Sequence, residues 1–224
     1  MNILALDTSG TAAGVAVLKN SVLAYEAMAV NGRTHSIHLM PMIEEALSRA
    51  GMVREDIGLI ACVSGPGSFT GIRIGVSAAK AIAHALGIPC VAVNALEALA
   101  FLPYEGVICP MLDARGGQVY GAAYRKHERL MEDGAMKIEE FLERIHALCS
   151  RFLFIGSGAA AYRGVISRVL AHTAAFAQER FNYINPGAVA ALALANRGSA
   201  VDYLTLAPYY LRAPQAERER AQKA

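Results

Sequence analysis

The amino-acid sequence predicts an α/β protein built from two similar lobes. Strand-like and helix-like apolar patterns alternate through both halves of the chain. A short pattern also recurs about half the chain apart, where Asp7 and Asp113 each follow a leucine and precede a glycine by three residues. With 224 residues, the chain is long enough for two lobes that each bury a core. An internal duplication explains the recurrence, and a coincidence between two β-hairpins is the alternative.

The first half opens with three strand patterns and continues with alternating helices and strands. Alternating apolar residues predict strands, and apolar spacings of three and four predict helices. In the first helix, Pro41 marks either a kink or the true start. The expected elements are strands at 2–8, 13–19 and 22–30, a helix at 35–51, a strand at 59–64, a helix at 71–86, a strand at 90–93 and a short helix near 95–102.

The second half repeats this beginning. We assign residues 1–102 to an N-terminal lobe and residues 103–224 to a C-terminal lobe. The charged tail after about residue 212 is expected to be disordered or to pack back on the protein. The expected elements are a strand hairpin at 112–124, an amphipathic helix at 139–149, a strand with a glycine turn at 152–158, and helices near 159–171 and 187–197.

Composition and charge argue against several classes of function. A formal net charge of +2 provides no general basic field for nucleic acid. The N-terminal residues lack the basic and long apolar regions of a signal peptide, and polar residues and a proline interrupt the apolar stretch at 72–93. We therefore expect a cytosolic protein with no membrane contact. The four cysteines form no CxxC pair and are expected to be reduced core residues: Cys62, Cys90, Cys109 and Cys149.

The first hairpin turn carries a candidate phosphate site. Asp7 ends a strand, and Thr8, Ser9 and Gly10 follow it as a small, hydroxyl-rich turn. Such a turn can direct N–H groups at a phosphate or hold a cation through water. In the alternative interpretation, the aspartate only caps its own turn through side-chain hydrogen bonds. The second hairpin lacks these hydroxyls, because Ala114 follows its aspartate.

The glycine-rich stretch SGPGSFTGIRIG at 64–75 also has two interpretations. Glycines expose backbone N–H groups and a helix N-terminus favours an anion, which suggests a nucleotide loop. However, Ile72 stands where a P-loop has its lysine, and the glycines are spaced GxGxxxG rather than GxGxxG. The stretch is therefore either a nucleotide site or a turn that leads into a helix.

The helix that follows carries a small residue at every fourth position. Such a stripe forms a groove that lets another element approach closely. The rest of the helix is mostly apolar, so it is buried either within its own lobe or partly against another chain. The stripe consists of Gly71, Gly75, Ala79 and Ala83, and the polar residues are Arg73, Ser77, Lys80 and His84.

Metal and hydrolase sites find little support. His35 and His38 stand three apart on a predicted helix, a spacing that can serve a metal, but no third ligand stands nearby in the sequence. A surface pair is the alternative. No GxSxG elbow surrounds any serine. We expect no metal, no cofactor and no catalytic residue.

Five stretches together resemble one bacterial family. They are ILALDTS, RTHSIHLMPMI, SGPGSFTGIRIG, LDARGGQVY and PYYLR, and the resemblance spans residues 3–212. They are similar to the family of the tRNA threonylcarbamoyladenosine biosynthesis protein TsaB, also called YeaZ. The resemblance implies the actin-like, Hsp70-like ATPase fold, in which two duplicated lobes have ribonuclease-H-like topology.

The same resemblance implies a role without catalysis. Proteins of this family work with the catalytic subunit TsaD and the ATPase TsaE to place threonylcarbamoyl on adenosine 37 of tRNA. It implies a heterodimer with TsaD, a homodimer when the chain is alone, and contact with tRNA only through the complex. The residues expected at these interfaces are His35, Leu39, Ile43, Gly71, Ile72, Gly75, Val76, Ala79 and Ala83.

The resemblance also indicates that a metal site is missing. In TsaD, the segment equivalent to VAVNALEALA carries two metal-binding histidines four residues apart, and Ala95 and Leu99 stand at these positions. Aliphatic side chains cannot ligate iron or zinc. One alternative is a small kinase or acyl-phosphate enzyme of the same fold, which needs phosphate clamps in both hairpins. Another is a metallopeptidase, which needs the missing ligands.

Overall fold

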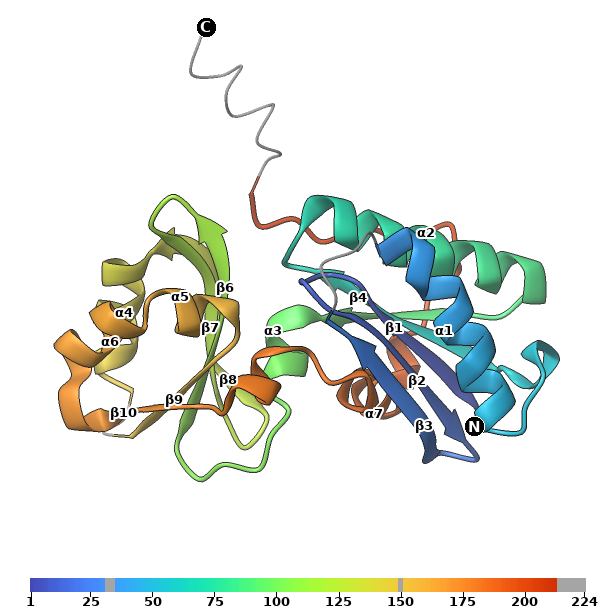
Figure 1. The fold of residues 1–224 in the computed structure, drawn as a ribbon, viewed down its shortest axis with the longest axis horizontal. Helices are drawn as coiled ribbons and strands as arrows, with labels where there is room; N and C mark the ends of the chain where they lie inside the picture. Colours follow the sequence, from blue (N-terminus) through green and yellow to red (C-terminus); the bar gives the residue numbers. More distant parts are fainter. Residues whose placement is uncertain (31–34, 149–150, 213–224) are drawn as a thin grey trace, which may run out of the picture.

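The protein has two lobes, and each is built on a five-stranded mixed sheet (Figure 1). The structure is a computed structural model, and it describes residues 1–30, 35–148 and 151–212. Cys149 and the tail after residue 212 lie outside these residues. Cys62, Cys90 and Cys109 are buried free thiols, as predicted.

The first sheet has the strand order β3-β2-β1-β4-β5. β1 pairs antiparallel with β2 and parallel with β4. Every residue of β1 is buried because helices cover both faces of the sheet, which explains why its sequence is almost continuously apolar. The strands are β1 (Ile3–Asp7), β2 (Ala13–Lys19), β3 (Val22–Ala29), β4 (Leu59–Gly65) and β5 (Cys90–Asn94).

The second sheet repeats the topology of the first. Read from β8, its order is β8-β7-β6-β9-β10, with the same parallel and antiparallel pairings. The predicted duplication is therefore confirmed. Two strands were not predicted from the sequence: β8, most of whose residues are half-buried, and β10, which is only three residues long. The strands are β6 (Val107–Arg115), β7 (Gln118–Arg125), β8 (Glu128–Lys137), β9 (Phe152–Ile155) and β10 (Ala174–Phe176).

Helices cover both faces of the sheets. In the first lobe, α1 and α2 pack on one face of the sheet. In the second lobe, α4 and α6 share an apolar cluster with the second sheet. Pro41 lies inside α1 and so does not mark its start. The helices are α1 (His35–Arg49), α2 (Phe69–Leu86), α3 (Ala95–Leu99), α4 (Ile138–His146), α5 (Ser157–Ala161), α6 (Arg163–Leu170) and α7 (Pro186–Ala195).

Local caps determine where α2 begins and ends. The hydroxyl of Ser68 accepts a hydrogen bond from the Gly71 N–H, so the helix begins at Phe69, two residues earlier than predicted. It ends before Gly87, whose φ of 64° is a left-handed conformation that glycine adopts without strain. The helix predicted near 159–171 is instead divided into α5 and α6 at Tyr162.

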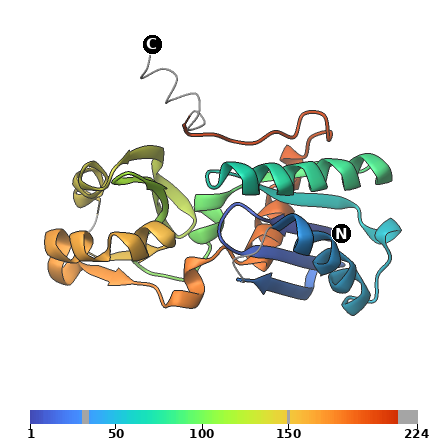
Figure 2. The same ribbon diagram turned by 45° about the horizontal axis from the view of Figure 1, so that its top comes forward.

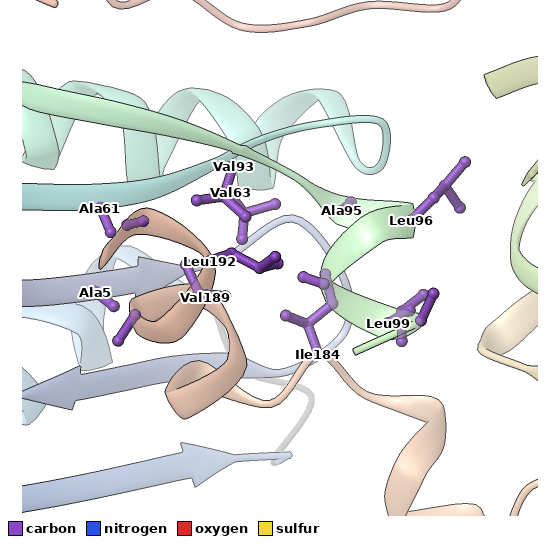
Figure 3. Packing of buried hydrophobic residues seen from close by; sticks show 14 of the residues in the cluster. Ala5, Ala61, Val63, Val93, Ala95, Leu96, Leu99, Ile184, Val189 and Leu192 are labelled. Carbon is purple, nitrogen blue, oxygen red and sulfur yellow. The ribbon is translucent and has the colours of Figure 1, made fainter. Parts of the chain in front are cut away.

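A shared apolar core joins the two lobes. It contains residues from both sheets together with α3 and α7. Figure 3 shows the part of this core that lies around the first sheet, α3 and α7. Although α7 follows the second sheet in sequence, it packs on β1 and β2 of the first. The reason is composition, because α7 is apolar on nearly every side and its buried residues include Val189 and Leu192. The division of the chain at residue 102 stays a proposal, but α7 does not pack where that division would place it.

The segment after α7 also returns to the first lobe. Val201 pairs with Cys90 at the start of β5, and the chain then runs beside α2 (Figure 2). Over the described residues, no helix has the length and apolar character needed to cross a bilayer.

Candidate functional site

A cleft of about 620 Å³ lies between the two lobes. This volume is in the range of small-molecule sites. Its walls are the two hairpin turns, the loop before α2, the start of α5 and the segment before α7. The cleft thus brings together the two aspartate turns that the sequence repeat predicted.

Most polar side chains of the first hairpin turn are hydrogen-bonded to other protein groups. Asp7 is buried, and its Oδ1 accepts hydrogen bonds from the Ser9 N–H at 2.8 Å and the Ser9 hydroxyl at 2.7 Å. The Thr8 hydroxyl donates to the Gly71 carbonyl at 2.7 Å. Burial raises the pKa of the Asp7 carboxyl to about 6. Both hydroxyls of the candidate phosphate site are therefore already bonded to protein, which favours the turn-capping interpretation.

His35 also contacts the first hairpin turn. The ring Nε2 of His35 lies 2.9 Å from the carbonyl oxygen of Gly10. His35 therefore contacts the turn rather than pairing with His38 around a metal. Within the described residues, histidine, cysteine and carboxylate side chains do not gather in any group of three that could hold a metal ion.

The glycine-rich loop lies directly against this hairpin. The Ser68 N–H donates to the Ser9 carbonyl at 2.7 Å. A Cβ added at Gly67 would overlap that same carbonyl oxygen, and one added at Gly71 would overlap the carbonyl oxygen of Thr8. These glycines are needed because two backbone segments approach closely. In this structure, the loop holds the first hairpin and begins α2.

The second hairpin turn is more open. Asp113 is exposed, and its Oδ1 accepts hydrogen bonds from the Arg115 N–H at 2.8 Å and the Tyr162 hydroxyl at 3.3 Å. The charged residues that line the cleft are Asp7, Asp113, Arg73 and Arg115. These opposite formal charges balance, so the cleft lacks the excess of positive charge that phosphate binding favours.

Ser157 and Asn182 also line the cleft, and neither was identified from the sequence as a site residue. Ser157 is the first residue of α5, and the connection from β9 to α5 is the equivalent of the connection from β4 to α2 in the first lobe. The duplication is therefore a signal from which this residue could have been predicted. The Ser157 hydroxyl accepts a hydrogen bond from the Asp113 N–H at 3.1 Å. Asn182 is the last residue of a short 3-10 helix, Glu179–Asn182, and its side-chain oxygen accepts a hydrogen bond from the Gly156 N–H at 2.9 Å. No local pattern in the sequence marks Asn182.

The two positions aligned with the metal-binding histidines lie in the apolar core. Ala95 and Leu99 are buried on α3 among residues of both sheets and α7 (Figure 3). Neighbours such as Val93 and Ile184 are also apolar. These two positions do not fit a metal ion, because aliphatic side chains occupy and surround them and such side chains carry no ligating atoms.

The structure places the expected interface residues against their own lobe, and their contact with another chain stays a prediction. The stripe and its apolar neighbours face β1 and β4, because a Cβ added at Gly75 would lie 2.6 Å from the Thr8 Oγ1 and 3.5 Å from the Cys62 Sγ. His35 is half-buried against the first hairpin, so it is not an open contact either. The expected contact residues that are buried within the lobe are Leu39, Ile43, Gly71, Ile72, Gly75, Val76, Ala79 and Ala83.

Comparisons of sequence connect this arrangement to known proteins. A family model described as TsaD, tRNA N6-adenosine threonylcarbamoyltransferase, matches residues 22–220. The tRNA threonylcarbamoyladenosine biosynthesis protein TsaB of Bacillus subtilis (strain 168) is 34% identical over 97% of this chain and 96% of its own length.

Comparisons of structure agree with these matches. YeaZ from Pseudomonas aeruginosa superposes with a TM-score of 0.80 at 27% identity, over 94% of this chain and 99% of its own. Component A of (R)-2-hydroxyglutaryl-CoA dehydratase from Acidaminococcus fermentans superposes with a TM-score of 0.52 at 13% identity, over 89% of this chain and 100% of its own, which is a likeness of fold alone. The predicted actin-like ATPase fold is confirmed.

Proposed function

This chain belongs to the TsaB family of tRNA threonylcarbamoyladenosine biosynthesis proteins, and from that premise we propose that it is the noncatalytic subunit of a threonylcarbamoyl-transferring complex. Its match to the TsaD family model also relates it to the proposed catalytic partner. We propose that it forms a heterodimer with TsaD, that TsaE joins this pair, and that tRNA is met only through the complex. This work would take place in the cytoplasm.

The observation that carries the noncatalytic role is the apolar surrounding of Ala95 and Leu99. Transfer of a carbamoyl or phosphoryl group needs a metal ion or fixed positive charges where negative charge develops. In this chain, the aligned metal positions are aliphatic and buried. The hydroxyls of Thr8 and Ser9 are bonded to protein groups. These features support a contribution through contacts rather than through chemistry.

The proposed contact surface uses the exposed sides of α1 and α2. Ile37 and Met40 on α1 expose 65% and 46% of their surface, although both are large and apolar. On α2, Ala81 and Ala85 are exposed. Exposed apolar side chains of this kind are typical of protein interfaces. We propose that TsaD covers them in the heterodimer and that a second copy covers them when the chain is alone.

Reconstitution with TsaD, TsaE and tRNA tests this function. Omitting the chain is expected to abolish formation of threonylcarbamoyladenosine, measured by mass spectrometry of tRNA digests. The double variant Ile37→Asp with Met40→Asp is expected to weaken TsaD binding about 100-fold, because charges would be buried at the contact.

A matched control separates the surface from a general effect of charge. Val169→Asp places a negative charge, one of the two that the double variant adds, on an apolar residue of the second lobe that is 54% exposed, and it should leave binding unchanged. Unaltered TsaD binding by the double variant would reject the surface. Full modification without the chain would reject the function itself.

ATP turnover by the isolated chain distinguishes the noncatalytic subunit from a small kinase or acyl-phosphate enzyme. We expect the rate of phosphate release from ATP to be no higher than in buffer without protein, and to be the same in Asp7→Ala. The reason is that the polar groups of the first turn are bonded to protein. Rapid ATP hydrolysis that Asp7→Ala abolishes would instead identify the first hairpin as a working phosphate site.

A further inference from the structure

The C-terminal segment of the described chain, residues 200–212, forms what we call the strap. It runs beside α2 in the direction of the second lobe (Figure 2). The Lys80 ammonium donates hydrogen bonds to the strap carbonyls of Leu204 at 3.3 Å and Leu206 at 3.1 Å. The ring of Tyr203 lies 4.5 Å from that of His84. The polar residues of α2 therefore hold the strap.

The next part of the strap contacts the end of β4 and the beginning of α2. The Tyr209 N–H donates to the Ser64 carbonyl at 2.8 Å, at the end of β4. The ring of Tyr210 stacks on Phe69 with centroids 4.5 Å apart, and its hydroxyl accepts a hydrogen bond from the Arg73 Nε at 3.0 Å. Phe69 and Arg73 both line the cleft on the side of the first lobe.

The end of the strap reaches the opposite wall of the cleft. The Arg212 Nη1 donates to the carbonyl oxygen of Ala114 at 3.2 Å, in the second hairpin. Ala114 lines the cleft from the second lobe. Two residues apart, Tyr210 and Arg212 thus contact the two sides of one cleft.

We propose that the strap is a clamp that sets the separation of the two lobes at the cleft. A guanidinium bonded to a carbonyl is a charge-assisted hydrogen bond, which is stronger than a neutral one. Because Tyr210 is held by stacking and by Arg73, the chain between Tyr210 and Arg212 is too short to let the second hairpin move away freely. The clamp acts on cleft opening in the free chain and does not depend on the proposed role in tRNA modification.

The clamp variants are expected to fold because other contacts also join the lobes. The shared apolar core contains α3 and α7 and does not include Arg212. The side-chain amide of Asn94 in the first lobe donates to the carboxylate of Asp133 in the second. Loss of Arg212 should therefore change the width of the cleft without unfolding the protein.

Distance measurements between spin labels test the clamp. Labels carried by unnatural amino acids at the exposed positions 44 on α1 and 139 at the start of α4 lie away from the strap contacts and leave the cysteines untouched. We expect Arg212→Ala to shift the distribution to longer and broader distances, and Arg212→Lys to restore part of it. Hydrogen exchange at the second hairpin should become about tenfold faster in Arg212→Ala.

Two further variants complete the experiment. Arg168→Ala removes the same charge from an exposed site on α6 and should leave the distances of the wild type. Tyr210→Phe keeps the stacking on Phe69 but removes the acceptor of Arg73, so a smaller shift in the same direction is expected. If Arg212→Ala and Tyr210→Phe both give the wild-type distribution in folded protein, the strap is not a clamp.

Discussion

Replacing Gly75 by leucine is expected to destabilise the first lobe by about 3 kcal/mol or more, because the new side chain would overpack the space between α2 and β1. Its Cβ alone would lie 2.6 Å from the Thr8 Oγ1 and 3.5 Å from the Cys62 Sγ. The Thr8 hydroxyl would then have to leave the Gly71 carbonyl to which it is bonded. Unfolding by urea, followed by circular dichroism, measures the change.

A second glycine provides a contrasting substitution at a position with free space around it. Gly164 lies within α6, and a Cβ added there would meet no atom within 4 Å. Gly164→Ala should therefore stabilise the protein by roughly 0.5 to 1 kcal/mol, because alanine is the better helix former. If Gly75→Leu kept the stability of the wild type but prevented association with TsaD, the stripe would be a contact between chains, contrary to the packing described above.

Replacing Asp7 by asparagine is expected to stabilise the protein by roughly 3 kcal/mol near neutral pH, since burial raises the pKa of this carboxyl from 3.8 to about 6. The folded state then binds a proton more tightly than the unfolded chain does. Stability from this group is fully present below pH 3.8, falls as the pH rises, and reaches its lowest value above about pH 6. An asparagine is neutral throughout and its oxygen can still accept both hydrogen bonds from Ser9.

Unfolding free energies measured at about pH 4 and about pH 7 separate this effect from others. The difference between Asp7→Asn and the wild type should be large at the higher pH and much smaller at the lower. Asp113→Asn is the matched control, because Asp113 caps the equivalent turn but is exposed. An Asp7→Asn protein less stable than the wild type at both pH values would mean that the negative charge stabilises the turn.

Much of the architecture was predictable from local patterns. The three opening strands, α1, α2 and the duplicated hairpins follow from apolar spacing and from the repeated aspartate turns. β8 was missed because a strand whose residues are mostly half-buried lacks clean alternation. The break at Tyr162 was missed because the residues on both sides of it continue a helical pattern.

The candidate site was predictable only in part. The repeat identified Asp7 and Asp113, and the duplicated topology brings their turns to opposite walls of one cleft. Asn182 escaped because its contact with the Gly156 N–H joins residues 26 positions apart, and no local pattern records such a contact. The polar residues of α2 were identified as a stripe, but the sequence did not indicate that the strap contacts three of them, Arg73, Lys80 and His84.

By itself, the sequence determined that α2 is a helix, that it follows a glycine-rich turn, and that it is apolar on most sides. It left open whether the small-residue stripe faces the helix's own sheet or another chain. In a helix that is apolar on almost every side, the pattern does not indicate which side packs on the sheet. The tertiary structure decided this. Pairing of β1 with β4 places Thr8 directly beside Gly71 and Gly75, where only a hydrogen fits. Likewise, the apolar composition of α7 required burial, but only the assembled sheets determined that β1 and β2 provide it.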